Sequence, residues 1–103
     1  MFQITVLYNH PTDVAAFDKH HDEVHVPLAA SIPGLQRYTV GRPTPGYGGA
    51  SPYHLVAVLE FADEATALAG LSAPEGEAAT ADLNNFAAAG VTLLQGAAEA
   101  VVR

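Results

Sequence analysis

The amino-acid sequence predicts an α+β fold with the element order β-α-β-β-α-β. Four segments are rich in β-branched and aromatic residues or alternate apolar with polar ones, as strands do. The longer segments after the first and third of these repeat apolar residues every three or four positions, as helices do. A chain of 103 residues has the size of one ordinary domain, and we expect residues 1–103 to form one.

The strands are predicted from these apolar patterns. The first covers residues 2–8, with its even positions on the more apolar face. The second covers 35–42, and the fourth covers 91–96. The third, 53–61, is nearly all apolar, which predicts burial on both faces and a central place in the sheet. Residues 43–52 contain six Pro or Gly residues in ten and predict a loop.

The first helix is predicted from a cap at Thr12 or Asp13 to about Val26. Pro27 should weaken it there, with a second short turn following. One face of this helix combines apolar side chains with two imidazoles, and these inward-facing residues are Phe17, His21, Val24, His25 and Leu28. His25 would then lie at the helix C-terminus, where the dipole favours the imidazolium form.

The second helical region is predicted in two pieces. Asp63 caps a helix that reaches about Leu71 and buries Ala65, Leu68 and Ala69. The segment Ser72–Glu75 matches a capping box, and Pro74 suits the first turn of the helix that it opens. That helix should continue to about Ala88, and Gly90 should end it.

This order of elements is that of the ferredoxin-like fold, an antiparallel sheet with helices on one face. The predicted strands carry apolar residues toward both faces, so a monomer would expose a large hydrophobic surface. We therefore expect a homodimer in which two sheets pack face to face.

Composition excludes several functions. Eleven acidic residues against four Lys and Arg give a net charge of −7, which disfavours binding to nucleic acids or to anionic membranes. No apolar run approaches the roughly 20 residues of a membrane span, and the first residues lack the basic region of a signal peptide. The absence of cysteine excludes disulfides and thiolate chemistry, and the cytoplasm is the expected location. No nucleophile elbow, Rossmann loop or P-loop is present.

Several segments together resemble the EthD family, whose founding member is tied to bacterial degradation of ethyl tert-butyl ether. The resemblance covers nearly the whole chain, and its segments occur in the same order: His25–Leu28, Tyr53–Phe61, Ser72–Gly76, Asp82–Phe86 and Gly90–Leu94. It implies a protomer that pairs into a dimeric α+β barrel. Related barrels include cofactor-independent monooxygenases, polyketide cyclases and lactone isomerases, and some EthD-like proteins carry the label reductase.

The resemblance also bears on the site. The family's histidine before Pro-Leu corresponds to His25. Relatives usually show tyrosines one turn earlier, where this chain has His20 and His21. A role that needs a phenol at those positions is therefore not expected here.

His25 and His21 are the predicted catalytic residues. An imidazole suits general acid or base catalysis because its pKa of about 6.5 lies near neutral pH. Three interpretations remain open: both rings are hydrogen-bonded core residues, both line a small-molecule pocket, or their i, i+4 spacing binds a metal. No third metal ligand is evident, so no metal site and no cofactor are predicted. The predicted partner is a small hydrophobic or oxygenated compound, with contacts expected from Tyr8, His20, Tyr53, Asn85 and Phe86. The expected function is that of an enzyme, monooxygenase-like or cyclase- or isomerase-like, that uses histidine acid–base chemistry. The alternatives are a non-catalytic accessory or ligand-binding protein of a catabolic or biosynthetic pathway, and a structural dimerisation module without a pocket.

Overall fold

The computed structural model of the protein describes residues 1–102. Its elements follow the predicted order, with the first helical region divided into three successive segments and the second into two. The strands are β1 (Phe2–Asn9), β2 (Arg37–Gly41), β3 (Tyr53–Phe61) and β4 (Val91–Ala97). The helices are α1 (Val14–His20), the π-helical segment η1 (His21–His25), α2 (Val26–Ala30), α3 (Glu64–Ser72) and α4 (Pro74–Phe86).

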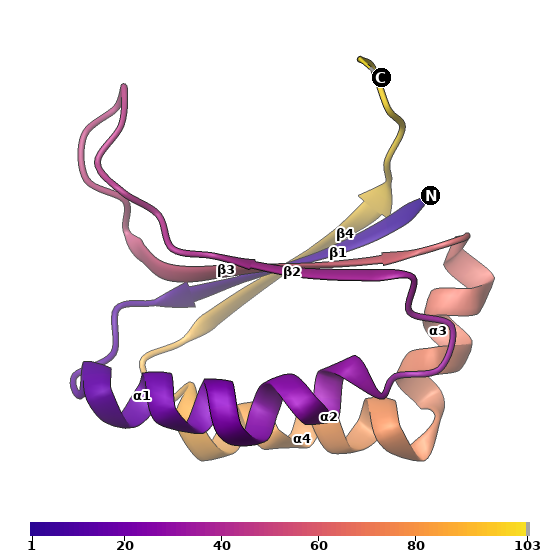
Figure 1. The fold of residues 1–103 in the computed structure, drawn as a ribbon, viewed down its shortest axis with the longest axis horizontal. Helices are drawn as coiled ribbons and strands as arrows, with labels where there is room; N and C mark the ends of the chain where they lie inside the picture. The colour runs from indigo at the N-terminus through magenta and orange to yellow at the C-terminus, as the bar shows by residue number, and fades with distance from the viewer. Residues whose placement is uncertain (103) are drawn as a thin grey trace.

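The four strands form one sheet in the order β2-β3-β1-β4, with every neighbouring pair antiparallel. The helices all lie on one side of this sheet, with α4 beside α1 and α2 (Figure 1). This is the predicted ferredoxin-like arrangement, and β3 has the predicted central position. None of the helices in residues 1–102 is long and apolar enough to cross a membrane.

The core lies between the sheet and the helices. The even residues of β1 are buried as predicted, and they are Phe2, Ile4, Val6 and Tyr8. In β3, burial on both faces is wrong: Leu55 and Phe61 face the helices and are fully buried, whereas Val56 and Val58 are half-buried. The difference arises because Val56 and Val58 lie on the side of the sheet that no helix covers.

Two of the three predicted helix caps are confirmed. Asp13 accepts a hydrogen bond from the Ala16 amide at 3.0 Å, and Asp63 accepts one from the Thr66 amide at 2.8 Å. The capping box at Ser72–Glu75 is wrong. Ser72 is the last residue of α3, and Ala73 alone separates the two helices and makes no side-chain cap.

The junction between α3 and α4 depends on glycines. A Cβ atom on Gly76 would lie 2.2 Å from the carbonyl oxygen of Gly70, and one on Gly70 would lie 2.3 Å from the carbonyl oxygen of Pro33. This close backbone approach sets which side of α3 is buried. Ala67 and Gly70 are the buried residues of α3, so the predicted inward residues Ala65, Leu68 and Ala69 are wrong. The second helix, α4, ends at Phe86, two residues before the predicted end.

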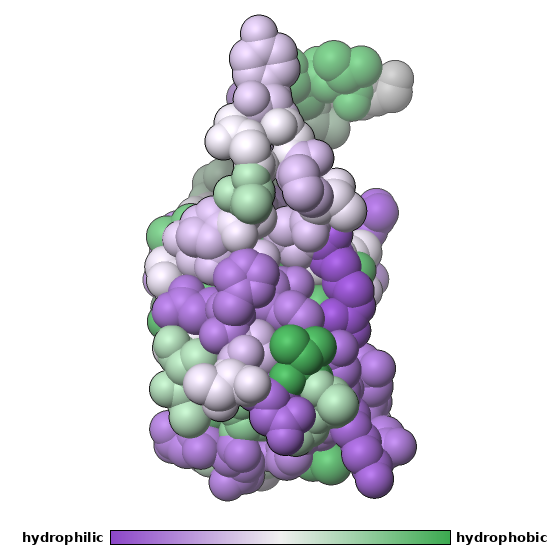
Figure 2. All heavy atoms as spheres, turned by 90° about the vertical axis from the view of Figure 1, so that its left-hand side faces the viewer, coloured by the Kyte–Doolittle hydropathy of each residue, from purple (hydrophilic) through white to green (hydrophobic). Residues whose placement is uncertain are grey.

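The surface differs between the two sides of the sheet. Figure 2 looks onto the end where α1 begins and shows mostly hydrophilic side chains over the helix layer, with the loop before β3 projecting at the top. Both this loop and the chain after β4 rise from the uncovered side of the sheet (Figure 1). That side carries a row of apolar residues from three strands: Leu7, Val56, Val58 and Leu94.

Candidate functional site

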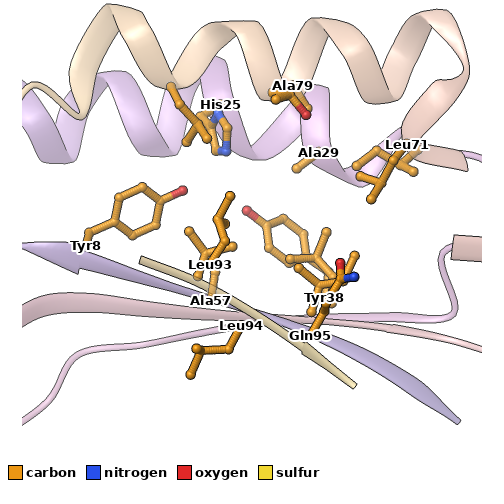
Figure 3. Close-up of a pocket in the computed structure, with 16 residues that line it drawn as sticks. Tyr8, His25, Ala29, Tyr38, Ala57, Leu71, Ala79, Leu93, Leu94 and Gln95 are labelled. Atoms are coloured by element: carbon orange, nitrogen blue, oxygen red, sulfur yellow. The ribbon is translucent and has the colours of Figure 1, made fainter. Parts of the chain in front are cut away.

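A cavity of about 290 Å³ lies between the helix layer and the inner face of the sheet. Its lining is mostly aliphatic, with contributions from β1, β2, β3, β4, α2 and α4 (Figure 3). A cavity of this size and polarity suits a small hydrophobic molecule, because such ligands bind in apolar hollows that hold a few convergent polar groups.

Five of the lining residues have polar side chains: Tyr8, His25, Tyr38, Thr80 and Gln95. The Thr80 hydroxyl donates to the Gly76 carbonyl oxygen at 3.0 Å, whereas the two tyrosines and the histidine point into the cavity. Tyr8 lies opposite Leu55 in the β1–β3 register, and Tyr38 lies opposite Leu59 in the β2–β3 register, so both face the helices. Their hydroxyls point toward the middle of the cavity, and the imidazole of His25 descends toward them from the helix layer (Figure 3). The cavity therefore has two phenolic groups on its sheet side and one imidazole on its helix side.

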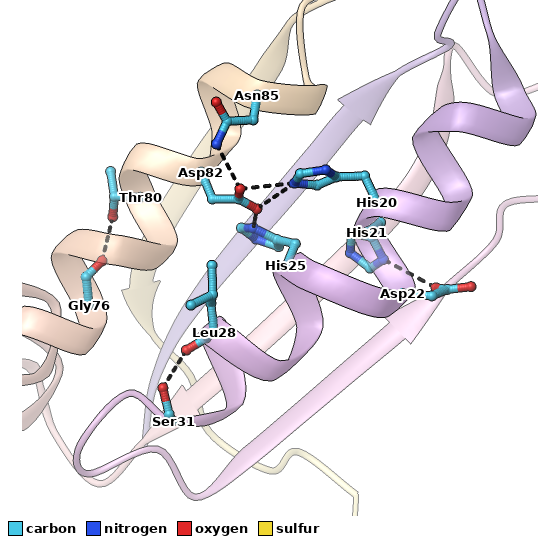
Figure 4. A network of polar contacts seen from close by, with 10 residues as sticks. All are labelled: His20, His21, Asp22, His25, Leu28, Ser31, Gly76, Thr80, Asp82 and Asn85. Atoms are coloured by element: carbon cyan, nitrogen blue, oxygen red, sulfur yellow. Dashed lines mark hydrogen bonds and ion pairs between the residues drawn. The ribbon is translucent and has the colours of Figure 1, made fainter.

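His25 is oriented by a carboxylate on the neighbouring helix. Its Nδ1 atom lies 3.0 Å from Oδ2 of Asp82 on α4, and both residues are 5% exposed (Figure 4). An ionised carboxylate accepts hydrogen bonds only, so Nδ1 carries the proton and donates it. Nε2 is then the unprotonated nitrogen, and it is the one that faces the cavity.

The charge states of these groups follow from their surroundings. Burial lowers the pKa of His25, and the hydrogen bond to Asp82 offsets this only in part, so the ring is neutral at neutral pH. Burial also raises the pKa of Tyr8, with smaller contributions from Tyr38 and Asp82, and it raises the pKa of Tyr38 to about 12. Both tyrosines therefore remain protonated and can donate hydrogen bonds.

Asp82 stays ionised despite its burial. Burial alone would raise its pKa, but hydrogen bonds from Asn85, His20 and His25 outweigh that effect and lower it. The Asn85 amide donates at 2.9 Å, and Nε2 of His20 lies 2.9 Å from Oδ1. These partners keep a negative charge next to His25.

The π-helical segment η1 places His25. The amide of Val26 bonds to the carbonyl oxygen of His21, five residues earlier, and Pro27 has no amide hydrogen to continue an α-helical ladder. The wider turn buries His21 and His25 but turns Val24 outward, so the prediction that Val24 faces inward is wrong: it is 43% exposed. Such π-helical turns occur often at functional sites.

The expected dipole effect on His25 is also wrong. The helix does not end near Val26 but continues as α2 to Ala30, so the free carbonyl groups of its C-terminus lie beyond the His25 ring. Burial dominates instead, and it favours the neutral ring.

His21 occupies a different environment from His25. Its side chain is fully buried; Nδ1 has only a long contact, 3.5 Å, to Oδ1 of Asp22 (Figure 4), and Nε2 has no hydrogen-bond partner in the described part of the chain. The ring stacks on Phe17 at 6.1 Å and meets the edge of Tyr8 at 5.6 Å. Burial lowers the pKa of His21, so this ring is also neutral. His21 packs behind the cavity and is not among its lining residues.

The predicted ligand contacts separate into groups. Tyr8 lines the cavity with His25. His20, Asn85 and Phe86 instead line a groove on the outer side of the helix pair, between the start of α1 and the end of α4. Tyr53 lies at the first position of β3, opposite Asn9, away from the cavity.

His54 lies at the register shift between Tyr8 and Asn9 and faces α1, where its Nε2 atom lies 2.9 Å from Oδ1 of Asp18. Its ring also meets Phe17 edge-on at 5.3 Å.

Two residues of the site were not predicted from the sequence. Tyr38 could have been found from its register, because it shares a strand face with Val40 opposite the buried residues of β3. Asp82 could have been found from helical spacing, because it lies three residues after Ala79 and four before Phe86, on the buried side of α4.

Comparison with known proteins agrees with the predicted resemblance. The family model described as the EthD domain matches residues 9–90. The chain belongs to the EthD family. An uncharacterized 11.0 kDa protein of Rhodococcus erythropolis, from the thcB-thcC intergenic region, is 42% identical over 94 residues, which is 91% of each chain.

Solved structures place the EthD chain among ferredoxin-like proteins. An EthD family protein from Bacillus halodurans superposes with a TM-score of 0.90 at 31% identity, over 96% of this chain and 99% of that one. A dimeric ferredoxin-like protein of unknown function from Thermobifida fusca gives 0.70 at 21% identity, over 94% and 90%. SnoaB, a cofactor-independent oxygenase from Streptomyces nogalater, gives 0.68 at 16% identity, over 98% and 94%. The last two likenesses show the fold alone.

Proposed function

We propose that this EthD protein is an enzyme that removes a proton from a small, hydrophobic, oxygenated compound bound in the cavity. One observation carries the proposal: a neutral imidazole, fixed by a buried carboxylate, directs Nε2 into an apolar cavity that also holds two phenolic hydroxyls. A base, an orienting carboxylate and oxyanion donors are the parts that enzymes of this kind need.

In this mechanism Nε2 of His25 takes a proton from a carbon or oxygen next to a carbonyl or aromatic ring. The electron pair moves onto the substrate oxygen, and the hydroxyls of Tyr8 and Tyr38 stabilise the resulting anion. Asp82 stabilises the imidazolium that forms and keeps the ring in the productive tautomer. The imidazolium then returns its proton to the product or loses it to solvent.

The anion formed in the cavity has three possible fates. Reprotonation at another atom gives an isomerase, attack within the same molecule gives a cyclase, and reaction with oxygen gives a monooxygenase. All three begin with the step assigned to His25. SnoaB, described as a cofactor-independent oxygenase, shares the fold, and this supports the class without selecting among the three.

A general test uses a substrate that needs only a base and an oxyanion donor. In 5-nitrobenzisoxazole, removal of the ring C–H proton breaks the N–O bond and releases a coloured phenolate. We expect the protein to accelerate this reaction, and His25→Ala to reduce the rate by about 10²-fold or more, since general bases contribute that much. His10→Ala, at an exposed histidine that does not line the cavity, is the matched control.

The alternative is an accessory protein that binds the same class of compound without turnover, which the largely aliphatic lining also supports. Calorimetry with 1-naphthol separates the two. Binding of 1-naphthol that is kept in His25→Ala, together with turnover that is lost, supports the enzyme. Binding by the natural protein with no turnover of any acidic C–H probe supports the accessory role.

We also propose that the protein is a homodimer in which two sheets pack face to face. The apolar row on the uncovered side of the sheet supports this, and so do relatives of the same fold that are described as dimeric. Burying such a row is the usual way to stabilise a sheet that has no helices on one side.

A further inference from the structure

Asp82 is shared by two imidazoles that belong to different parts of the site. Its Oδ2 atom lies 3.0 Å from Nδ1 of His25 and 3.1 Å from Nε2 of His20, and its Oδ1 atom lies 2.9 Å from the same nitrogen of His20. Figure 4 shows the carboxylate between the two rings, with Asn85 as its third partner. The single negative charge of Asp82 is therefore shared by two imidazoles, His20 and His25, each of which can bind a proton.

The two rings meet different surroundings. The side chain of His25 is 7% exposed and lines the cavity, whereas that of His20 is 27% exposed and lies in the outer groove. His20 also stacks on Phe86, with ring centroids 5.0 Å apart, which keeps it against the carboxylate. His20 is therefore the more solvent-accessible of the two rings that share Asp82.

The other titratable groups around the pair do not compete for this charge. Tyr8, which faces His25 from β1, stays protonated. His21 lies next to His25 on η1 and is neutral, and Asp22 lies beside His21 with its side chain 63% exposed. Among the described residues 1–102 that hydrogen-bond to Asp82, only His20 and His25 can become cations.

We propose that His20 is a positioning residue for His25: it shares the Asp82 carboxylate, weakens the attraction that would otherwise charge the His25 ring, and so keeps His25 able to act as a base. This inference rests on the base role proposed above for His25. When His20 is protonated, its ion pair with Asp82 neutralises the carboxylate, and the attraction that would charge His25 is reduced.

Two substitutions should move the titration of His25 in opposite directions. In His20→Gln, the amide can still donate a hydrogen bond to Asp82 but cannot become charged, so the carboxylate attracts a proton to His25 alone. His25 should then titrate at a higher pH than in the natural protein. In His20→Arg, a permanent cation lies beside Asp82, and His25 should titrate at the same or a lower pH.

The measurement is a pH titration of the histidine ring signals by NMR on the full chain, with His10→Gln as the control. His10 is exposed, and its ring contacts the Ser51 carbonyl instead of Asp82. The expected result is an upward shift of the His25 titration in His20→Gln, no upward shift in His20→Arg and no change in His10→Gln. The acid limb of the 5-nitrobenzisoxazole rate profile should move with the His25 titration.

The proposal is overturned if His25 titrates identically in the natural protein, His20→Gln and His20→Arg, or if both substitutions shift it the same way. A purely structural role of His20 predicts that second pattern, because both changes disturb the same packing. If the opposite shifts occur but the protein does not turn over the probe, the coupling through Asp82 is supported and the base role of His25 fails instead.

Discussion

At the scale of single residues, the site depends on which nitrogen of His25 carries the proton. Asp82 selects the tautomer because an ionised carboxylate can only accept, so Nδ1 must donate and Nε2 must face the cavity unprotonated. The two tyrosines complete the arrangement from the sheet side. The chemistry therefore depends on one hydrogen bond between two helices.

Replacing Asp82 by asparagine should reverse this selection. An asparagine amide can donate to Nδ1, which would place the proton on Nε2 and remove the base from the cavity. We expect the rate with 5-nitrobenzisoxazole to fall by about tenfold or more, as when an orienting carboxylate is removed in other enzymes. Asn85→Ala, which removes a partner of Asp82 that does not touch His25, should have a smaller effect. Equal rates for the natural protein and Asp82→Asn would exclude this role of the carboxylate.

His21 should reduce stability, because its Nε2 atom is buried without a partner and its Nδ1 atom has only a 3.5 Å contact to the exposed Asp22 carboxylate. We expect His21→Phe to stabilise the protein by about 1–2 kcal/mol, since an unpartnered buried polar group costs about that much. Urea denaturation at pH 8 measures this, and His21→Leu is a second variant in case phenylalanine is too large. A clear loss of stability in both would contradict the interpretation.

The same residue should make stability depend on pH. The pKa of His21 is lower in the folded protein than its ordinary 6.5, so the folded state binds fewer protons than the unfolded state. The free energy of unfolding is therefore not affected by the titration of His21 above about pH 6.5. It decreases as the pH falls from there toward the folded pKa of His21. Stability curves of the natural protein should decline more steeply below pH 6.5 than those of His21→Phe, in which His25 still contributes in the same direction. Parallel curves would argue against a neutral, buried His21.

At the scale of elements, the close packing of α3 on α4 should tolerate no added side-chain atom at Gly76. A Cβ atom there would lie 2.2 Å from the Gly70 oxygen and 2.5 Å from the Leu71 Cα atom, and both are backbone atoms that cannot move alone. We expect Gly76→Ala to lower the free energy of unfolding by about 1–3 kcal/mol. Gly48→Ala is the matched control, because no atom of the described residues lies within 4 Å of a Cβ atom at that position.

Some of the helices, strands and caps could be predicted from the sequence, and others could not. The strands and the caps at Asp13 and Asp63 were predictable, because alternation and capping are local properties. The capping box at Ser72–Glu75 was not refutable from sequence, because the contact that replaces it is between backbones. The π-helical turn was also missed, since an ordinary helix with the same residues buries Val24 and leaves His25 at an end.

The residues of the site could be predicted only in part, because some of them are brought together by tertiary contacts between segments distant in sequence. His25 and Tyr8 lie on elements whose inward faces follow from simple periodicity. Asp82 and Tyr38 reach the site from segments distant in sequence, and only the pairing of helices and strands brings them together. The grouping of His20 with Asp82 depends on the same tertiary contact.

At the scale of the whole molecule, the uncovered face of the sheet should hold the two protomers together. A carboxylate at the centre of this face would have to be buried without a partner, so Val58→Asp should give a monomer. Analytical ultracentrifugation should show twice the chain mass of 10.7 kDa for the natural protein and the single mass for this variant. Leu68→Asp, at an exposed position on α3, should remain dimeric. If the natural protein is monomeric at micromolar concentration, the proposed homodimer is wrong.

The central claim is that His25 presents an unprotonated Nε2 atom to the cavity at neutral pH, and nitrogen NMR of the histidine rings tests it most directly. We expect His25 to carry its proton on Nδ1 at pH 7.5 and the addition of 1-naphthol to perturb the Nε2 signal. A proton on Nε2, or a ring that is already an imidazolium at that pH, would contradict it.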